Sequence, residues 1–308
     1  MREKPSRLIL ELSQNCNLNC IMCGFGGRPI DKSKFFDENL FEKIVAEKEF
    51  LSNINEIRLN GRGESTINPR FQELVKKISH YFPDARMSIT SNLMFPNEEI
   101  IDTFNEYNID LVVSVDSANK KDYEFIRKGS DYNLLIERLQ EIKNCHIIFT
   151  LQKYNVERIQ SIGEFAQKHG FGLILNIIRV DDQDYQNEFN KLLNEKWGLI
   201  LKQLKTLHQI IPQEKLFIPD QIWGKKIPEN LATTITSWSL PMCPNAREEL
   251  MIAYNGKIFP CCMFNPYIFG TTSTDSLEKI WNSQQRREFV ENYRDNYYCQ
   301  KCEYMIHK

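Results

Sequence analysis

The feature that most constrains the fold of this chain is a regular alternation of short apolar runs and helical segments over residues 6–178. The runs are RLILEL (7–12), EIRLNG (56–61), RMSIT (86–90), LVVSVD (111–116), HIIFTL (146–151) and LILNII (173–178). Between them, apolar residues recur at helical spacing, as Phe71, Leu74 and Ile78 do. Strands that alternate with helices form a parallel sheet covered by helices. Six such units are too few for a closed eight-stranded barrel, so the sequence predicts an α/β fold with a partial (β/α)6 TIM-like barrel over residues 1–180.

In barrels of this kind, the functional residues lie at the carboxyl ends of the strands. The residues at or just beyond the predicted strand ends include Cys16, Gly61, Ser91, Asp116 and Gln152. We therefore expect the functional site on that side of the sheet.

The pattern changes after residue 180. An amphipathic helix with Phe189, Leu193 and Leu204 on its apolar face begins a bridging segment, for which we expect residues 181–240. A small α+β domain is predicted for residues 241–308. It begins with a hairpin that turns at Asn255-Gly256, followed by a helix capped by Asp275 or Ser276.

Composition excludes several classes of function. The formal net charge is -2, which gives no electrostatic reason to expect nucleic acid or an anionic membrane as a partner. No apolar run is long enough to span a bilayer, and the first residues lack the pattern of a secretory signal. We therefore expect a cytoplasmic protein.

The chain has nine cysteines, and in a reducing compartment clustered cysteines indicate metal binding or redox chemistry. Cys145 stands alone beside a predicted strand and is predicted to be a small buried hydrophobic residue. The other eight form an amino-terminal and a carboxyl-terminal group.

The amino-terminal group is CNLNCIMC, which contains Cys16, Cys20 and Cys23. Thiolates are soft ligands that favour zinc or iron–sulfur clusters. Structural zinc normally has four protein ligands, but the next histidine is His80, inside a predicted helix. A [4Fe–4S] cluster held by three cysteines would leave one iron open. A structural zinc knuckle is the alternative.

The CxxxCxxC spacing in the loop after a first strand resembles the motif of the radical S-adenosylmethionine (SAM) superfamily. The resemblance implies a [4Fe–4S] cluster held by Cys16, Cys20 and Cys23, whose open iron binds the amino and carboxylate groups of SAM. It also implies that SAM is cleaved reductively to methionine and a 5′-deoxyadenosyl radical, which abstracts a hydrogen atom from the substrate.

Three further segments resemble SAM-binding elements of that family. NGRGES is similar to its GGE-type loop, which contacts the SAM amino group, with Gly61, Gly63 and Glu64 as the matching residues. Arg62 stands where the family has the second glycine, and an ordinary glycine turn is the alternative. ITSNLM resembles the T-N-G segment and supplies Ser91 and Asn92.

The third segment, SVDSANKKDYEFIRKG, resembles an S-x-D-x…R element. The resemblance implies that Ser114 and Arg127 hold the SAM carboxylate, with the arginine as a bidentate donor. A surface ion pair is the alternative for Arg127. Met22 would lie near the adenine.

Near the other end of the chain, Cys243 is followed by twelve residues and then by GKIFPC, which ends at Cys261. The segment CQKC, with Cys299 and Cys302, comes later. This arrangement resembles the SPASM extension of radical SAM enzymes, in its shortened form called a twitch domain. The resemblance implies a second, auxiliary [4Fe–4S] cluster with a full set of protein ligands, and a zinc ribbon is the alternative. The four implied ligands are Cys243, Cys261, Cys299 and Cys302. Cys262 is left over as an alternative ligand, an inert neighbour or a catalytic thiol that donates hydrogen to a substrate radical.

Two clusters and SAM suggest oxidation, because an auxiliary cluster can accept an electron from a substrate radical. We expect dehydrogenation of a hydroxylated, sugar- or aminocyclitol-like small molecule, as in an aminocyclitol-oxidising branch of the family. The first strand begins by residue 7, which leaves no room before it for a leader-binding element and weighs against a peptide.

Three alternatives stay open beside this expectation. The chain would otherwise be an epimerase, crosslinking or thioether-forming enzyme acting on a peptide, with Cys262 or Cys145 as the hydrogen donor of an epimerase. A non-enzymatic iron–sulfur or zinc scaffold is the remaining class. A radical SAM enzyme would also need an electron donor such as flavodoxin or ferredoxin. The acidic residues Asp181, Asp182 and Asp184 are predicted to form a solvated loop rather than to supply a base.

Overall fold

One large sheet organises the computed structural model, which describes residues 4–178, 182–233, 244–261 and 267–300. In spatial order its strands are β14 (Gly270–Thr271), β13 (Lys257–Phe259), β12 (Glu249–Ile252), β1 (Arg7–Leu10), β3 (Glu56–Arg58), β4 (Arg86–Ser91), β5 (Asp110–Ser114), β7 (His146–Leu151), β8 (Gly172–Ile177) and β9 (Leu216–Phe217). Every pairing from β12 to β9 is parallel, and β13 and β14 are antiparallel additions. The predicted α/β fold with a partial barrel is confirmed.

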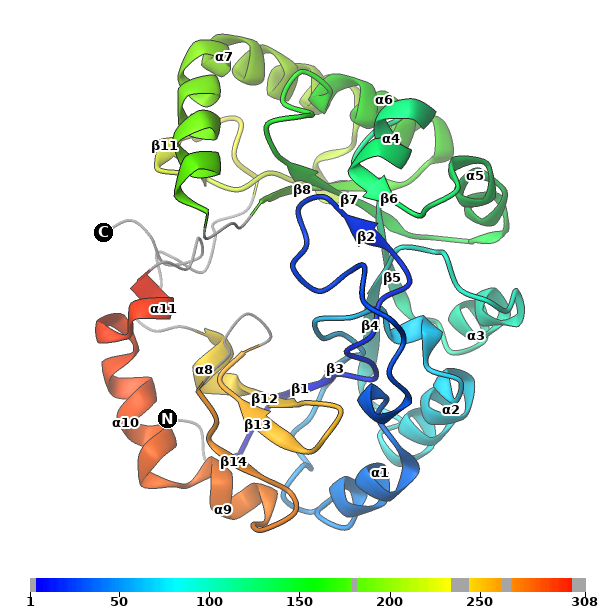
Figure 1. Ribbon diagram of the computed structural model, residues 1–308, viewed down its shortest axis with the longest axis vertical. Coiled ribbons are helices and arrows are strands. Elements are labelled where there is room, and N and C mark those ends of the chain that lie inside the picture. The colour runs from blue at the N-terminus through cyan, green and yellow to red at the C-terminus, as the bar shows by residue number, and fades with distance from the viewer. Residues whose placement is uncertain (1–3, 179–181, 234–243, 262–266, 301–308) are drawn as a thin grey trace.

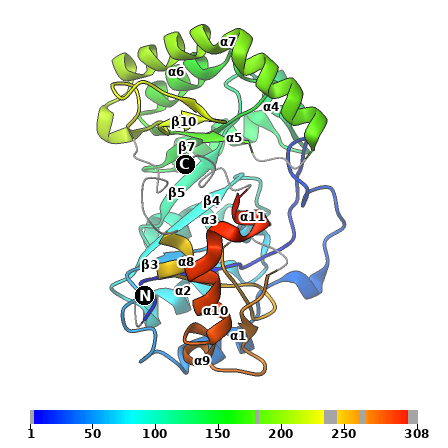
Figure 2. The same ribbon diagram turned by 90° about the vertical axis from the view of Figure 1, so that its left-hand side faces the viewer.

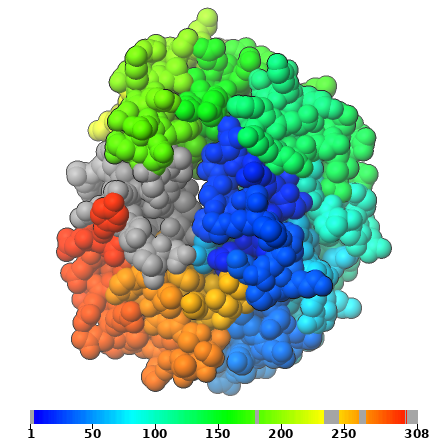
Figure 3. All heavy atoms as spheres, in the orientation of Figure 1, coloured from blue at the N-terminus to red at the C-terminus, as the bar shows by residue number. Residues whose placement is uncertain are grey.

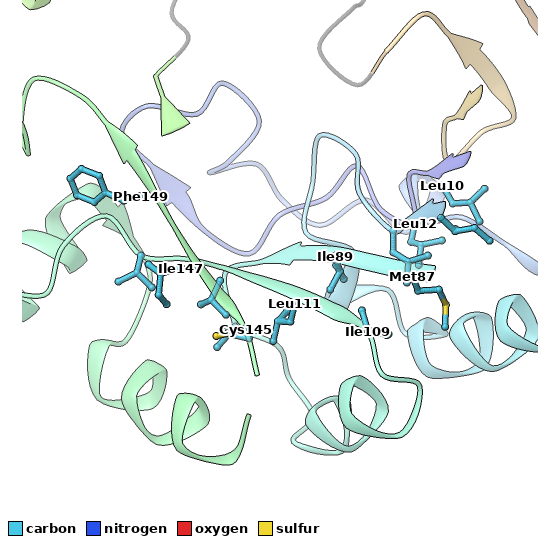
Figure 4. Close-up of a cluster of buried hydrophobic side chains, with 14 of the residues drawn as sticks. Leu10, Leu12, Met87, Ile89, Ile109, Leu111, Cys145, Ile147 and Phe149 are labelled. Carbon is cyan, nitrogen blue, oxygen red and sulfur yellow. The ribbon is translucent and has the colours of Figure 1, made fainter. Parts of the chain in front are cut away.

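Helices cover the outer face of this curved sheet (Figure 1). They are α1 (Glu38–Val45), α2 (Phe71–Tyr81), α3 (Glu99–Glu106), α4 (Lys120–Ile126), α5 (Tyr132–Glu141), α6 (Ile159–His169) and α7 (Gln183–Ile210). Alternate strand residues such as Ile89, Leu111 and Ile147 pack against them in one continuous hydrophobic core (Figure 4). Because successive side chains of a strand point to opposite faces, the residues between them line the inner face.

The inner face of the sheet is less tightly covered than the outer face. Along β4, β5, β7 and β8 the buried residues alternate with half-buried ones. The inner face of the sheet is therefore partly accessible among the described residues.

The segment after β8 is more ordered than its sequence indicates. The predicted amphipathic helix is present as α7, and Phe189, Leu193 and Leu204 are buried. The stretch that follows adds β9, a further parallel strand on the sheet, and a small hairpin formed by β10 (Gln221–Ile222) and β11 (Lys225–Lys226). A two-residue strand leaves no periodic pattern, which is why β9 escapes prediction.

The carboxyl-terminal segment begins with α8 (Pro244–Glu248) and contains the predicted hairpin. Gly256 has φ +78° in the turn between β12 and β13. In place of one predicted helix there are two, α9 (Leu277–Trp281) and α10 (Gln284–Asn292), because Ser276 and Ser283 each cap a new helix. α9 and α10 lie at the end of the molecule opposite α6 and α7, and α11 (Tyr297–Gln300) lies between the two ends (Figure 2).

The hairpin is joined to the barrel by backbone pairing. β12 pairs in parallel with β1 over four residues, from Arg7 opposite Glu249 to Leu10 opposite Ile252. An ion pair between Arg7 and Glu248, 3.3 Å apart, reinforces this contact. The domain limits expected from the sequence (1–180, 181–240 and 241–308) remain predictions. In the described residues, the sheet runs continuously from the first of these segments to the last.

Membrane association was not expected, and among the described helices none combines the length and hydropathy that crossing a bilayer requires.

Candidate functional site

The amino-terminal cysteines lie in a long loop between β1 and α1, which crosses the middle of one face of the molecule (Figure 3). Asn15 closes this loop, because its side chain exchanges two hydrogen bonds of 2.9 Å with the backbone of Asp31. Cys16 is half-buried, Cys20 is buried and Cys23 is exposed. The loop is thus held at its base, with one thiol at the surface.

A two-stranded pairing ties this loop to the segment after β5. In it β2 (Asn19–Cys20) runs antiparallel to β6 (Arg127–Lys128), with Cys20 opposite Arg127. The backbone N–H of Ile21 also donates to the Ile126 carbonyl at 2.9 Å. Two segments that the sequence associates with the cluster and with SAM are therefore neighbours.

The three thiols influence one another electrostatically. Burial, with smaller contributions from the charges of Glu64 and the other two thiols, raises the pKa of Cys16 to about 11. Burial also raises the pKa of Cys20, although the charge of Arg127 opposes the shift. Ligation requires thiolates, so cluster binding would release protons here.

The donor set fits an iron–sulfur cluster better than a single ion. Nowhere in the described residues do three His, Cys, Asp or Glu side chains converge as ligands of one metal ion. A zinc ion needs its ligands about 2.3 Å from one centre, whereas a four-iron cluster spreads its thiolates over several iron atoms. Three thiols on one loop, spread apart but electrostatically coupled, suit the second arrangement.

The loop after β3 lies directly against the cysteine loop. A Cβ atom on Gly63 would overlap the backbone carbonyls of Ser13 and Asn15, and one on Gly61 would overlap the Glu11 side chain. The Glu64 N–H donates to the Asn15 carbonyl at 2.8 Å. Gly63 is needed because two backbones meet here, and Gly61 leaves room for the Glu11 side chain.

Glu64 is fully buried, and its carboxylate is occupied by protein donors. One oxygen accepts from the Thr66 N–H and hydroxyl and from the Ser91 hydroxyl at 3.0 Å, and the other accepts from the Asn92 N–H at 2.8 Å. Burial raises the pKa of Glu64, against the effect of these bonds. The hydrogen bonds of this carboxylate therefore connect the loop after β3 to the end of β4. Because both carboxylate oxygens already accept from protein donors, any contact of Glu64 with SAM would come from its backbone.

Replacing Glu64 with alanine should lower the free energy of unfolding by about 3 kcal/mol, because several buried donors would lose their partner. Asp37 is the matched control, since it caps α1 through a single bond to the Leu40 N–H at 2.8 Å and is exposed. Its alanine variant should lose only about 1 kcal/mol. Urea unfolding curves of both variants measure the difference, and equal losses would contradict this role of Glu64.

Ser91 and Asn92 lie where β4 ends, as expected. The Asn92 side chain donates to Asn17 at 3.1 Å and approaches the Cys16 sulfur at 4.0 Å. The next residue, Leu93, has φ +58°, a left-handed conformation that favours glycine. Leu93 stands at the position of the glycine in the T-N-G segment that ITSNLM resembles. The left-handed backbone conformation is therefore present here without a glycine.

Ser114 and Arg127 lie on the same side of the sheet, and Arg127 has a partner that the sequence did not reveal. Its guanidinium forms an ion pair of 2.8 Å with Asp116, and both side chains are almost completely buried. Burial alone would lower the pKa of Arg127, but Asp116 raises it, so the guanidinium stays charged. Ser114 is half-buried at the end of β5.

Some polar atoms near these strand ends have no partner in the described part of the chain. They include Arg127 Nε and both amide atoms of Gln152, which follows β7 and is fully buried. Buried polar groups are normally hydrogen-bonded, so a bound ligand such as SAM fits here. Met22 is partly buried against the core.

Arg62, the departure from the GGE pattern, links three segments. Its backbone N–H and Nε both donate to one oxygen of Glu11, at 2.9 and 3.1 Å. Its guanidinium lies 4.8 Å from the ring centre of Phe259 in β13 and 6.0 Å from that of Phe25 in the cysteine loop. A glycine could make none of these side-chain contacts.

Of the carboxyl-terminal cysteines, the structure places Cys261 and Cys299, both half-buried. Cys243, Cys262 and Cys302 lie outside the described residues, so their expected roles stay predictions. Cys145 is buried at the amino end of β7 within the outer core (Figure 4), and burial raises its pKa to about 12. This location suits a core residue and not a hydrogen donor.

The acidic residues after β8 do not supply a recognisable base. Asp182 caps α7 by accepting from the Tyr185 N–H at 2.7 Å, and Asp184 is exposed in the first turn. Asp181 lies outside the described residues.

Comparison with known proteins defines the class. Residues 10–166 match the model of the radical SAM superfamily, and residues 243–303 match that of SPASM, an iron-sulfur cluster-binding domain. The chain belongs to the radical SAM superfamily and is an enzyme of that class with a SPASM domain. These domains imply SAM and two iron–sulfur clusters as cofactors.

Two curated relatives show how far the sequence similarity extends. A tungsten-containing aldehyde ferredoxin oxidoreductase cofactor-modifying protein of Pyrococcus furiosus is 31% identical over 105 residues, which are 34% of this chain and 29% of that protein. The mycofactocin maturase MftC of Mycolicibacterium smegmatis is 23% identical over 303 residues, covering 94% of this chain and 73% of that protein.

Solved structures confirm the fold. Streptococcus suis SuiB bound to S-adenosylmethionine has a TM-score of 0.66 at 17% identity, over 98% of this chain and 72% of SuiB. BtrN in complex with AdoMet and 2-DOIA has a TM-score of 0.53 at 14% identity, over 95% of this chain and 88% of BtrN.

Proposed function

We propose that this enzyme dehydrogenates a hydroxylated, sugar- or aminocyclitol-like small molecule bound against the inner face of its sheet. In this proposal Cys16, Cys20 and Cys23 hold the SAM cluster. The SAM molecule is held by Met22, Gly61, Gly63, Glu64, Ser91, Asn92, Ser114 and Arg127. The auxiliary cluster is held by Cys243, Cys261, Cys299 and Cys302.

The observation that supports this substrate class is the set of side chains on the inner face of the sheet, at the carboxyl ends of the strands. Toward the carboxyl ends of the strands, the half-buried inner residues are short, neutral and polar: Asn60, Thr90, Ser114, Thr150 and Asn176. Nearer the amino ends, the half-buried inner positions are mixed and hold Arg58, Ser88, Val112, His146, Ile148 and Ile174. Several are already oriented by one another, since Asn60 exchanges two bonds of 3.2 Å with the Thr90 backbone and Asn176 donates to the Thr150 hydroxyl at 3.4 Å. Hydroxyl and amide groups of this kind bind the hydroxyl groups of a neutral substrate.

The edges of the sheet also favour a compact substrate. Many peptides bind by adding a strand to an exposed sheet edge. Here the two edge strands, β14 and β9, have two residues each. So short an edge offers few backbone groups to an extended peptide.

Peptide modification is the second candidate, and the comparisons support it. The maturase MftC matches 94% of this chain, and SuiB has also been solved bound to its precursor peptide SuiA, with a TM-score of 0.62 to this chain. In this alternative Cys262 would donate hydrogen to an inverted carbon of the peptide.

Two labelled reactions distinguish the candidates. With a substrate deuterated at the carbinol carbon, a dehydrogenase should transfer deuterium to 5′-deoxyadenosine and release a ketone with two fewer hydrogens. In D2O, a peptide epimerase should instead incorporate solvent deuterium without a change in oxidation state. Cys262→Ala should leave dehydrogenation intact, with Cys145→Ala as the control. Solvent deuterium at an inverted peptide carbon would overturn the proposal.

A further inference from the structure

The solvent-exposed part of the cysteine loop lies beside the thiols that would hold the SAM cluster. Reductive cleavage of SAM consumes one electron, which must reach that cluster from outside the enzyme. A carrier in solvent must come close to a cluster held by the cysteine loop in order to reduce it. Of the three thiols only Cys23 is exposed, and residues 27–33 after it are exposed without interruption. The approach from solvent therefore passes over this part of the cysteine loop.

The loop is held next to β6 and α4. Gly27 donates its N–H to the Leu18 carbonyl at 3.1 Å and lies against the Asn19 side chain, while Asn19 pairs with Lys128 on its other side. Arg28 and Lys128 are consequently on neighbouring segments, as the position of β2 beside β6 shows (Figure 1). We call the exposed surface of residues 24–34, α4 and β6 the cysteine-loop face.

This face has more basic than acidic groups available. Three carboxylates of this face form ion pairs with basic side chains. The pairs are Asp31 with Lys34 (3.8 Å), Asp122 with Arg158 (3.2 Å) and Glu124 with Lys120 (3.8 Å). Four exposed bases form no ion pair with any described residue: Arg28, Lys32, Lys121 and Lys128. The local charge is therefore positive on a chain whose formal net charge is -2.

Apolar side chains are exposed on and beside the same face. Ile30 is 50% exposed between Arg28 and Lys32. Phe125 on α4 is 50% exposed and makes an edge contact with Tyr154, 48% exposed, with ring centres 5.5 Å apart. Exposed aromatic and apolar residues ringed by arginine and lysine are typical of protein–protein contact surfaces.

We propose that the cysteine-loop face is the docking surface for a small acidic protein that carries one electron. On docking, the carrier is oxidised by one electron and the cluster held by the cysteine loop is reduced by one. Charge complementarity would mainly accelerate association and make it sensitive to salt. This inference rests on the proposed cluster site but not on the identity of the substrate.

The test compares two charge-reversed double variants. K32E/K128E alters the face, and K202E/K205E makes the same charge change on exposed lysines in the carboxyl-terminal half of α7. Because α7 connects parallel strands β8 and β9, that half lies toward the opposite end of the barrel. Binding of a purified acidic flavodoxin to the reconstituted enzyme is measured by calorimetry at two salt concentrations.

K32E/K128E should weaken flavodoxin binding on the order of tenfold and reduce its salt dependence, while K202E/K205E should bind like the wild type. Formation of 5′-deoxyadenosine should fall for K32E/K128E with reduced flavodoxin but not with dithionite. Equal binding by both variants, or no binding to the wild type, would overturn the docking proposal. So would tighter binding of a single-stranded oligonucleotide than of flavodoxin to this face. Loss of the dithionite reaction in the wild type would instead contradict the proposed cluster site.

Discussion

Replacing Cys20 with alanine is expected to remove about half of the iron from the reconstituted enzyme, from about eight to about four atoms per chain, and to abolish formation of 5′-deoxyadenosine. Cys20 is buried in β2, opposite Arg127. Without it the loop offers two thiols, and the described structure brings no further His, Cys, Asp or Glu into a group that could replace it.

Cys145→Ala is the matched control for this experiment. It removes another buried thiol, this one from the hydrophobic core, at a cost of about 1–2 kcal/mol in stability, and should keep both clusters. Iron and sulfide analysis with absorption spectra after anaerobic reconstitution gives the result. Full iron content in Cys20→Ala would contradict ligation by this thiol, and stoichiometric zinc in place of iron would favour the zinc knuckle.

The second large effect concerns stability. Asp116→Asn should lower the free energy of unfolding by about 3–5 kcal/mol, because it leaves the buried charge of Arg127 without its partner. The substitution preserves shape, and the amide oxygen can still accept from the Thr150 N–H, which lies 2.8 Å from Asp116. The loss therefore reports the charge and not a cavity.

Asp122 provides the comparison, since it pairs with Arg158 at 3.2 Å in a solvent-exposed setting, with side chains 33% and 52% exposed. Exposed pairs contribute less than about 1 kcal/mol, so Asp122→Asn should be nearly neutral. Urea unfolding of the two variants, with unchanged slopes, measures the contrast. Similar losses in both would show that the Asp116–Arg127 pair does not stabilise the fold as argued.

The sequence predicts the repeated part of the fold well. The six expected strands correspond to β1, β3, β4, β5, β7 and β8, because each has a local apolar pattern between turn residues. It does not predict β9, which is too short for a pattern. Nor does it predict the β1–β12 pairing, which joins residues far apart in the chain and depends on tertiary packing.

The candidate site shows the same division between local and tertiary information. The cysteine spacing is a local motif and is visible in the sequence. The partners of Glu64, Arg62 and Arg127 include Asn92, Glu11 and Asp116, which follow other strands, so these contacts appear only in three dimensions. The sequence shows that Arg62 departs from the GGE-type motif, but this departure does not reveal the salt bridge of Arg62 to Glu11.

The pairing of β1 with β12 has a consequence for synthesis of the chain. β1 receives its second neighbour only when residues 249–252 have emerged from the ribosome, about 240 residues after the strand itself. At roughly 5–20 residues per second, this delay is about 12–50 s. During that time the strand leading into the cysteine loop has an open edge, which is a site of mispairing for nascent chains. Amino-terminal fragments of this enzyme should therefore depend on chaperones until the hairpin is made.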